Sequence, residues 1–243
     1  FQKDNIYDIF RPNLKKILDI EKLHRKMGLS LLSPYEFYSL HTSYLYLQKI
    51  IDSLESHLPE IYIDNQECIS ELVLFTNEYK SLFDLDELEK YSMINMSTSI
   101  FNKGIHNEID ELQDSILEAK NMVNLISTKL GKYIDTKKKG SVKNEINDKY
   151  GYHLYVTEAR SRTFNKSVLN LQDTVVTIGN IKLDLKDIKF TKRGSNVHIE
   201  FGYLNELSNN IVLNQLKIQK LNKKYYLEVK KNSHKLMKKV LKN

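Results

Sequence analysis

The chain has 243 residues, of which 41% are hydrophobic and 28% are charged, so it is a globular protein long enough for two domains. Its one cysteine, Cys68, excludes an internal disulfide framework and a cysteine-based zinc site, and favours an intracellular protein. The net charge of +6 is uneven: residues 1–130 hold 13 Lys/Arg against 21 Asp/Glu, whereas residues 131–243 hold 24 against 10. This excess favours a polyanionic partner for the second half, although merely solvated, lysine-rich helix faces would produce the same excess.

The chain contains no run of about 18 apolar residues, so we expect no membrane span. Its start, FQKDNIYDIF, is not a signal peptide. It begins in the middle of an apolar pattern, and we therefore expect the chain to be part of a longer one.

The first helical patterns lie before residue 30. Pro12 interrupts a continuous helix there or lies in a first helical turn. Residues 19–26 predict one short helix, which ends near Gly28.

Ser33-Pro34-Tyr35-Glu36 is a helix start, with serine at the cap, proline at the first position and glutamate at the third. Apolar residues then recur every three or four positions as far as Leu54. Pro59 ends the segment that follows. Residues 61–83 predict another helix and residues 85–91 a shorter one.

Two long helices are predicted by heptad patterns. Over residues 109–133, apolar side chains recur at alternating spacings of three and four, which is the seam of a coiled coil. Residues 204–241 predict the second long helix, in which the same heptad is kept, with the polar Asn214 at one seam position. Its apolar seam positions are Leu204, Leu207, Ile211, Ile218, Leu221 and Tyr225. The two helices most simply pair antiparallel; separate packing of each into a bundle is the alternative.

Between the long helices, residues 137–201 change to short alternating segments separated by turns, which predict a small antiparallel sheet. The stretch 142–157, VKNEINDKYGYHLYVT, predicts a strand, a tight turn at Lys149-Tyr150-Gly151 with Gly151 at positive φ, and a second strand. Further strands are expected over residues 174–178, 181–185 and 196–201. The expected fold class is mainly α with a small β insert.

The switch in pattern also predicts the domain division. Residues 1–136 and 202–243 would form a helical stalk of antiparallel long helices, and residues 137–201 a separable β tip. Lys137-Lys138-Lys139-Gly140 is the expected exposed hinge between them.

No enzyme motif is present. The sequence has no phosphate-binding loop of the Walker type, no GxGxxG, no HExxH and no GxSxG. Its seven histidines fall in different elements without ligand spacing, and its carboxylates share helix faces with Lys and Arg. We therefore expect no catalytic residues and no metal site.

Basic residues at turns of the β insert are the sequence feature that indicates a function. Arg160 and Arg162 follow the second strand with Lys166 nearby, and Lys192 and Arg193 precede a Gly-Ser turn. Such sites present cations, hydroxyls and backbone amides together, as phosphate contacts require. The alternative is that these residues are solubilising charges on loops.

Four stretches, in order, resemble the MutS family of DNA mismatch-repair proteins. The stretch 142–157 resembles the family's clamp strand pair, LKV-x-YN-x-x-x-GYYI-x-(I/V)-(S/T). Asp19-Ile20-Glu21-Lys22-Leu23 is similar to D-(I/L)-E-R-(I/L), and Ser33-Pro34-Tyr35-Glu36-Phe37 to S-P-R-D-L. Gly104 with residues 107–112 resembles the G-x-x-x-E-L-D-E-L start of the long helix.

The resemblance implies a lever of long antiparallel helices that carries an antiparallel β-sheet clamp at its tip, with backbone contacts to duplex DNA. The family's TLKN stretch corresponds to residues 190–193. The expected DNA-binding residues are Lys143, Arg160, Arg162, Lys166, Lys192, Arg193, Ser195 and Asn196.

The resemblance also implies partners and cofactors. Double-stranded DNA is the expected partner, with a second copy of the chain possible only through domains outside this sequence, and an intracellular, DNA-associated location follows. The family's ATPase domain has no counterpart here, so ATP and Mg²⁺ are expected for the full-length protein only. The alternative function is a coiled-coil spacer whose β tip binds a protein partner.

Overall fold

The computed structural model describes residues 4–135, 140–147 and 151–240, and it divides the chain into two compact units. The first unit is Phe1–Asp110 with Ile218–Asn243, and the second is Glu111–Lys217. Among the described residues, no helix is both long enough and apolar enough to cross a bilayer. The expected hinge at Lys137-Lys138-Lys139 and the turn residues Lys149-Tyr150 lie outside the described residues, and the expected separate folding of residues 137–201 stays a prediction.

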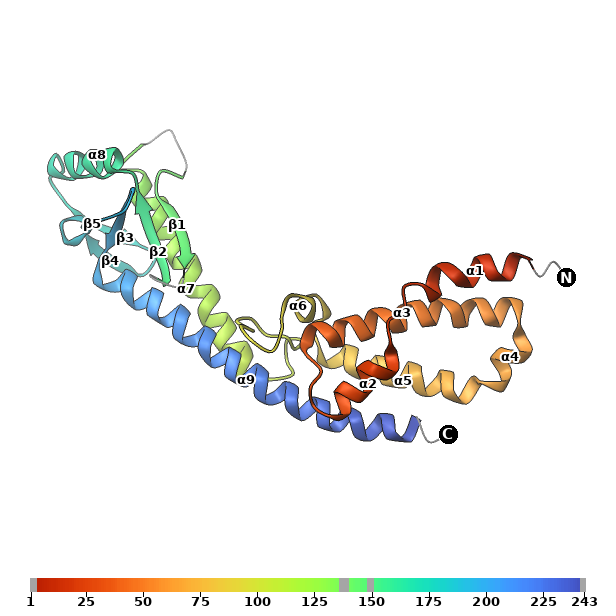
Figure 1. Ribbon diagram of the computed structural model, residues 1–243. Helices are drawn as coiled ribbons and strands as arrows, with labels where there is room; N and C mark the ends of the chain where they lie inside the picture. The colour runs from red at the N-terminus through yellow and green to blue at the C-terminus, as the bar shows by residue number, and fades with distance from the viewer. Residues whose placement is uncertain (1–3, 136–139, 148–150, 241–243) are drawn as a thin grey trace. The chain divides into compact units, whose positions relative to one another are not determined.

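The first unit is built of helices (Figure 1). They are α1 (Asp4–Leu14), α2 (Ile20–Gly28), α3 (Pro34–His57), α4 (Pro59–Asp64), α5 (Gln66–Leu82) and α6 (Leu85–Lys90), with the start of α7 (Asn107–Gly131) and the end of α9 (Gly202–Val240). Helices α3 and α5 pack antiparallel through an aromatic cluster, in which Phe37 contacts Tyr79 and Tyr44 contacts Phe75. This cluster is the core of the unit.

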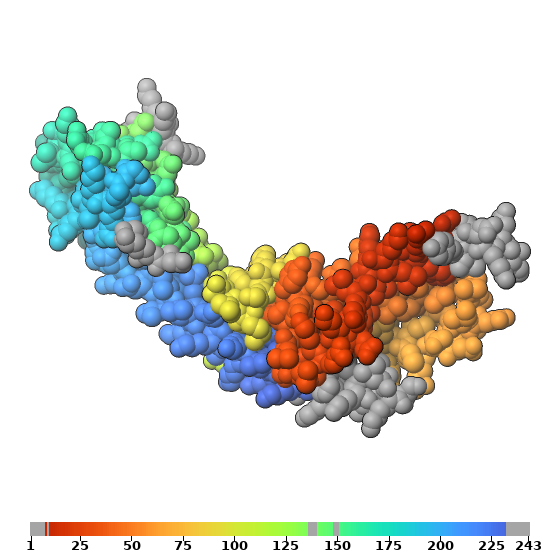
Figure 2. All heavy atoms as spheres, in the orientation of Figure 1, coloured from red at the N-terminus to blue at the C-terminus, as the bar shows by residue number. Residues whose placement is uncertain are grey.

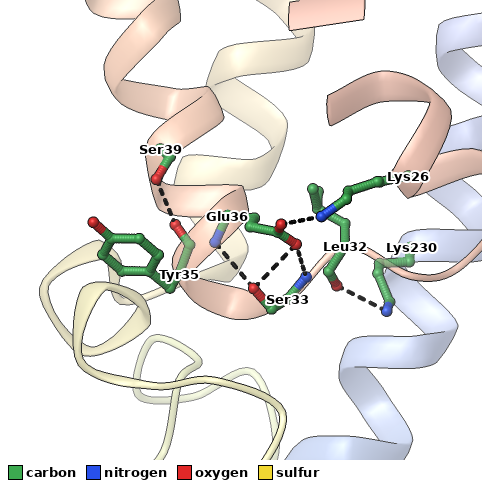
Figure 3. A network of polar contacts seen from close by, with 7 residues as sticks. All are labelled: Lys26, Leu32, Ser33, Tyr35, Glu36, Ser39 and Lys230. Carbon is green, nitrogen blue, oxygen red and sulfur yellow. Dashed lines mark hydrogen bonds and ion pairs between the residues drawn. The ribbon is translucent and has the colours of Figure 1, made fainter. Parts of the chain in front are cut away.

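The predicted helix start at Ser33 is confirmed. The Ser33 hydroxyl accepts from the Glu36 amide at 3.3 Å, and the Glu36 carboxylate accepts from the Ser33 amide at 3.0 Å, which completes a capping box. Lys26 of α2 pairs with the same carboxylate, as Figure 3 shows. The cap therefore joins α2 to α3 as well as starting α3.

A buried lysine secures the loop that precedes this cap. The Lys230 ammonium donates to the carbonyls of Ser30 and Leu32 at 2.9 and 3.0 Å (Figure 3). It also lies over the Tyr226 ring, 4.8 Å from the centroid. Burial lowers the pKa of Lys230 to about 8.

Three local predictions in the first unit were wrong. Pro12 lies inside α1, near its end, and the helix expected over residues 61–83 is interrupted at Asn65, which separates α4 from α5. The expected seam of α9 also moves: Leu221 and Tyr225 are only half-buried, while Asn222 is buried. The Asn222 amide donates to the Thr98 and Met96 carbonyls at 2.6 and 3.1 Å. Because these loop carbonyls need a hydrogen-bond donor, a polar residue is buried here in place of the apolar seam residues.

The second unit pairs the rest of α7 with the first half of α9, antiparallel as predicted (Figure 1). The predicted seam is buried along both helices, at Ile116, Ala119, Val123, Ile126 and Leu130 and at Leu204, Leu207 and Ile211. Asn214 is buried at its seam position, where its amide donates to the Ser115 hydroxyl at 3.2 Å and to Asn210 at 2.7 Å. A polar seam residue of this kind sets the register of two helices at some cost in stability.

The second unit also contains the β strands, in two sheets. The strands are β1 (Lys143–Asn147), β2 (Gly151–Val156), β3 (Val175–Ile178), β4 (Ile181–Asp184), β5 (Lys189–Arg193) and β6 (Asn196–Glu200), with the 3₁₀ turn η1 (Leu185–Asp187) before β5. A four-stranded antiparallel sheet has the order β1-β2-β6-β5, and β3 pairs with β4 separately. The expected small antiparallel sheet is confirmed, but the sequence did not predict β5 or the helix α8 (Glu158–Leu169) that follows β2.

Gly151 takes positive φ, +64°, as the sequence predicts, and so does Gly194. A Cβ on Gly151 would lie 3.1 Å from the Ser208 hydroxyl and 3.3 Å from a Val212 methyl, whereas a Cβ on Gly194 would meet nothing within 4 Å. We expect Gly194→Ala to lower the free energy of unfolding by about 1 to 2 kcal/mol, the cost of a left-handed backbone alone. Gly151→Ala should cost more in chemical denaturation, and an equal or smaller cost would contradict the close approach of β2 to α9.

The half-buried His24 and the buried His41 predict acid sensitivity of the first unit. Burial lowers the pKa of His24 and of His41 to about 4, and each ring is hydrogen-bonded to a tyrosine hydroxyl. In the unfolded chain these histidines bind protons below their ordinary pKa of about 6.5, whereas in the folded chain they stay neutral until about pH 4. The free energy of unfolding is therefore highest above about pH 6.5 and decreases as the pH falls toward about 4. Melting temperatures should drop between pH 7 and pH 5, and less steeply in His24→Gln and His41→Gln; identical slopes in all three proteins would refute the assignment.

Candidate nucleic-acid interface

The four-stranded sheet has one apolar and one polar face. Side chains at paired positions share a face, so Lys143, Tyr155, His198 and Thr191 form one row across the four strands. The opposite face is apolar and buried, at Leu154, Val156, Val197 and Ile199, with Phe190 packed on Phe164 of α8. Helix α8 thus lies against the apolar side of the sheet.

The polar face is tied together internally. The Arg193 guanidinium donates to the Glu200 carboxylate at 2.7 Å, which also accepts from the Thr191 hydroxyl at 3.1 Å. His153 and His198 are stacked with ring centroids 4.5 Å apart and line a pocket with Arg193 and Glu200. Burial, then the neighbouring His153 and Arg193, lower the pKa of His198. The polar side chains of this face are therefore mainly hydrogen-bonded or stacked with one another.

Helix α8 carries three of the predicted site residues. Arg160, Arg162 and Lys166 were expected at turns, and that placement was wrong, because residues 158–169 are helical. Arg160 points inward and donates to the Ser141 carbonyl at 3.1 Å. Arg162 and Lys166, four residues apart, lie on one exposed face of the helix.

Glu158, in the first turn of α8, brings two of the predicted cations together. One of its carboxylate oxygens lies 2.6 Å from the Arg162 guanidinium, and the other lies 3.1 Å from the Lys192 ammonium of β5. Both cations are well exposed, at 74% and 67% of the side chain. Lys192, and then Arg162, hold the pKa of the Glu158 carboxyl below its ordinary value.

The remaining predicted residues lie at strand ends. Ser195 is exposed in the turn that Gly194 opens between β5 and β6, and Asn196 is half-buried at the start of β6. Lys143 is exposed at the start of β1, the opposite edge strand of the sheet. Figure 2 shows α8 at the surface of the second unit beside the chain of β5 and β6. The structure thus groups Arg162, Lys166 and Lys192 on one surface and places Lys143 and Arg193 elsewhere on the sheet.

Sequence reasoning missed Glu158 because it treated carboxylates as solvated helix charges. A signal was available: Glu158 and Arg162 have the i,i+4 spacing of a helical ion pair. The contact with Lys192 spans 34 positions in the chain and required the fold.

Two curated proteins are similar to the chain, and no protein-family model matches it. One is a mutS homolog of Acanthamoeba polyphaga mimivirus, 26% identical over 197 residues, a match that covers 76% of this chain and 17% of that protein. The other is the DNA mismatch repair protein MutS of Alkaliphilus metalliredigens, 28% identical over 149 residues, which covers 61% of this chain and 16% of that protein. The chain therefore spans less than a fifth of the length of either relative.

The contacts of the two arginines on α8 predict different roles. Arg160→Ala removes a charged donor from the carbonyl of the buried Ser141, so it should lower the free energy of unfolding by about 1 kcal/mol. Arg162→Ala breaks only an exposed pair and should change stability little. Denaturant unfolding of both variants tests this, and an equal loss would mean that Arg160 is not a structural arginine.

Proposed function

We propose that this chain, which is similar to two proteins named for MutS, is part of a MutS-family DNA mismatch-repair protein and forms a lever and clamp that hold duplex DNA through sequence-independent contacts to the phosphate backbone. The observation that carries the proposal is the group of exposed cations Arg162, Lys166 and Lys192 on α8 and β5. Lys and Arg side chains bind phosphate oxygens without reading the bases. This role gives the protein an intracellular, DNA-associated location.

The lever in this proposal is the set of long helices, and the clamp is the β-containing part between α7 and α9. The seam of α7 and α9 supports it, since an antiparallel pair of long helices gives a stiff support for a DNA-binding element. The alternative, a coiled-coil spacer whose β tip binds a protein, is not favoured, because both relatives are named for DNA mismatch repair.

We propose no catalytic role for this stretch of chain. Among the described residues, no group of three or more His, Cys, Asp or Glu side chains could hold a metal ion. We assign ATP and Mg²⁺ to parts of the protein outside this sequence.

The experiment measures binding of a fluorescent DNA duplex to the whole chain at several salt concentrations. Each phosphate contact contributes roughly −0.9 to the slope of log affinity against log salt, so Lys166→Ala with Lys192→Ala should flatten this slope by about 1.8. Affinity should fall by a similar factor for duplexes of unrelated sequence, because the contacts are to the backbone.

Lys182→Ala with Lys186→Ala is the matched control, since it removes two exposed lysines from the same unit near β4 and η1. It should alter the slope less than the Lys166 and Lys192 pair does. Equal effects of the two double variants would show that binding is a general response to net charge, and a loss confined to one DNA sequence would show that bases are read.

A further inference from the structure

We propose that Arg162, Lys192 and Glu158 form one phosphate-exchange site, in which the Glu158 carboxylate occupies the place that a DNA backbone phosphate takes in the complex. The inference rests on the proposed function and deepens it. It assigns to Glu158 the role of an internal competitor that limits the affinity of the surface for DNA.

The Glu158 carboxylate binds both cations at once. Its two oxygens are engaged separately, one by the α8 guanidinium at 2.6 Å and the other by the β5 ammonium at 3.1 Å. A single anionic group therefore bridges a helix and a strand that are far apart in the chain. A phosphodiester offers the same arrangement, one negative charge shared by two non-bridging oxygens on one centre, to the same pair of donors.

All three side chains of this site are accessible to solvent. The Glu158 side chain is 47% exposed, and those of Arg162 and Lys192 are 74% and 67% exposed, so an incoming phosphate can reach all three. Ion pairs this exposed contribute little to folding, because water and salt screen them. Replacing the carboxylate by a phosphate therefore leaves the fold intact and keeps both cations paired.

The ion pair of Arg193 and Glu200, on the same sheet, differs on both counts. Arg193 and Glu200 are only 33% and 31% exposed, and Glu200 is also held by the Thr191 hydroxyl of β5. That pair lies on the polar face of the sheet beside the stacked histidines and serves packing. The exchangeable carboxylate is thus Glu158.

The test is a double-mutant cycle on duplex affinity, measured with the whole chain at low salt. Glu158→Gln keeps the shape of the side chain and frees both cations, so it should tighten binding roughly fivefold at about 50 mM salt. In a chain that also carries Arg162→Ala and Lys192→Ala, the same change should give no more than the small gain expected from a lost negative charge.

Glu145→Gln is the matched control, because Glu145 is an exposed carboxylate on β1 and its loss changes the net charge equally. A melting curve for each variant verifies folding. Equal gains from Glu158→Gln and Glu145→Gln would overturn the exchange site, as would a full gain that survives removal of both cations. Failure of both the wild-type chain and Glu158→Gln to bind duplex would overturn the proposed function, and this inference with it.

Discussion

Burial of the seam between α7 and α9 is the constraint on which the second unit depends, because both chain connections of its strands pass through these helices. The seam side chains of the two helices, from Ile116 to Leu130 and from Leu204 to Ile211, are buried. One further bond ties the sheet to this support: the amide of Tyr152 on β2 donates to the Ser208 hydroxyl of α9 at 3.1 Å. The close approach needed for it explains why a glycine precedes Tyr152, since any Cβ there would crowd Ser208.

Two carboxylates of the second unit hold the cations Arg162, Lys192 and Arg193 in place. Glu158 joins α8 to β5 through Lys192, and Glu200 joins β5 to β6 through Arg193. Because these three cations are held by carboxylate partners, they have less side-chain freedom left to lose when an anion binds. Pairing therefore has two opposite effects on the surface: it preorganises the cations and it competes with their ligand.

The sequence predicted most of the helices and the hairpin, because their patterns are regular. The heptads of α7 and the Ser33 cap are local signals that survive without knowledge of the fold. Helix α8 was missed because its buried face is Ser161, Phe164 and Val168, with only two apolar residues at helical spacing. Strand β5 was missed because Phe190 is the only apolar residue in KFTKR. The moved seam of α9 and the pairing of Lys192 depend on distant carbonyl and carboxylate partners, which no local pattern encodes.

The existing partner of each cation also matters when the number of Lys and Arg residues is used to predict a DNA-binding surface. A count of Lys and Arg in residues 137–201 treats all of them alike, yet Arg160 bonds the Ser141 carbonyl and Arg193 bonds Glu200. A guanidinium that is hydrogen-bonded to a buried carbonyl or to a half-buried carboxylate must break that bond before it can bind a phosphate. The surface that can bind a backbone at little cost is thus narrower than the basic composition suggests. It centres on the exposed face of α8 and on Lys192, with Glu158 as the charge that any phosphate must first displace.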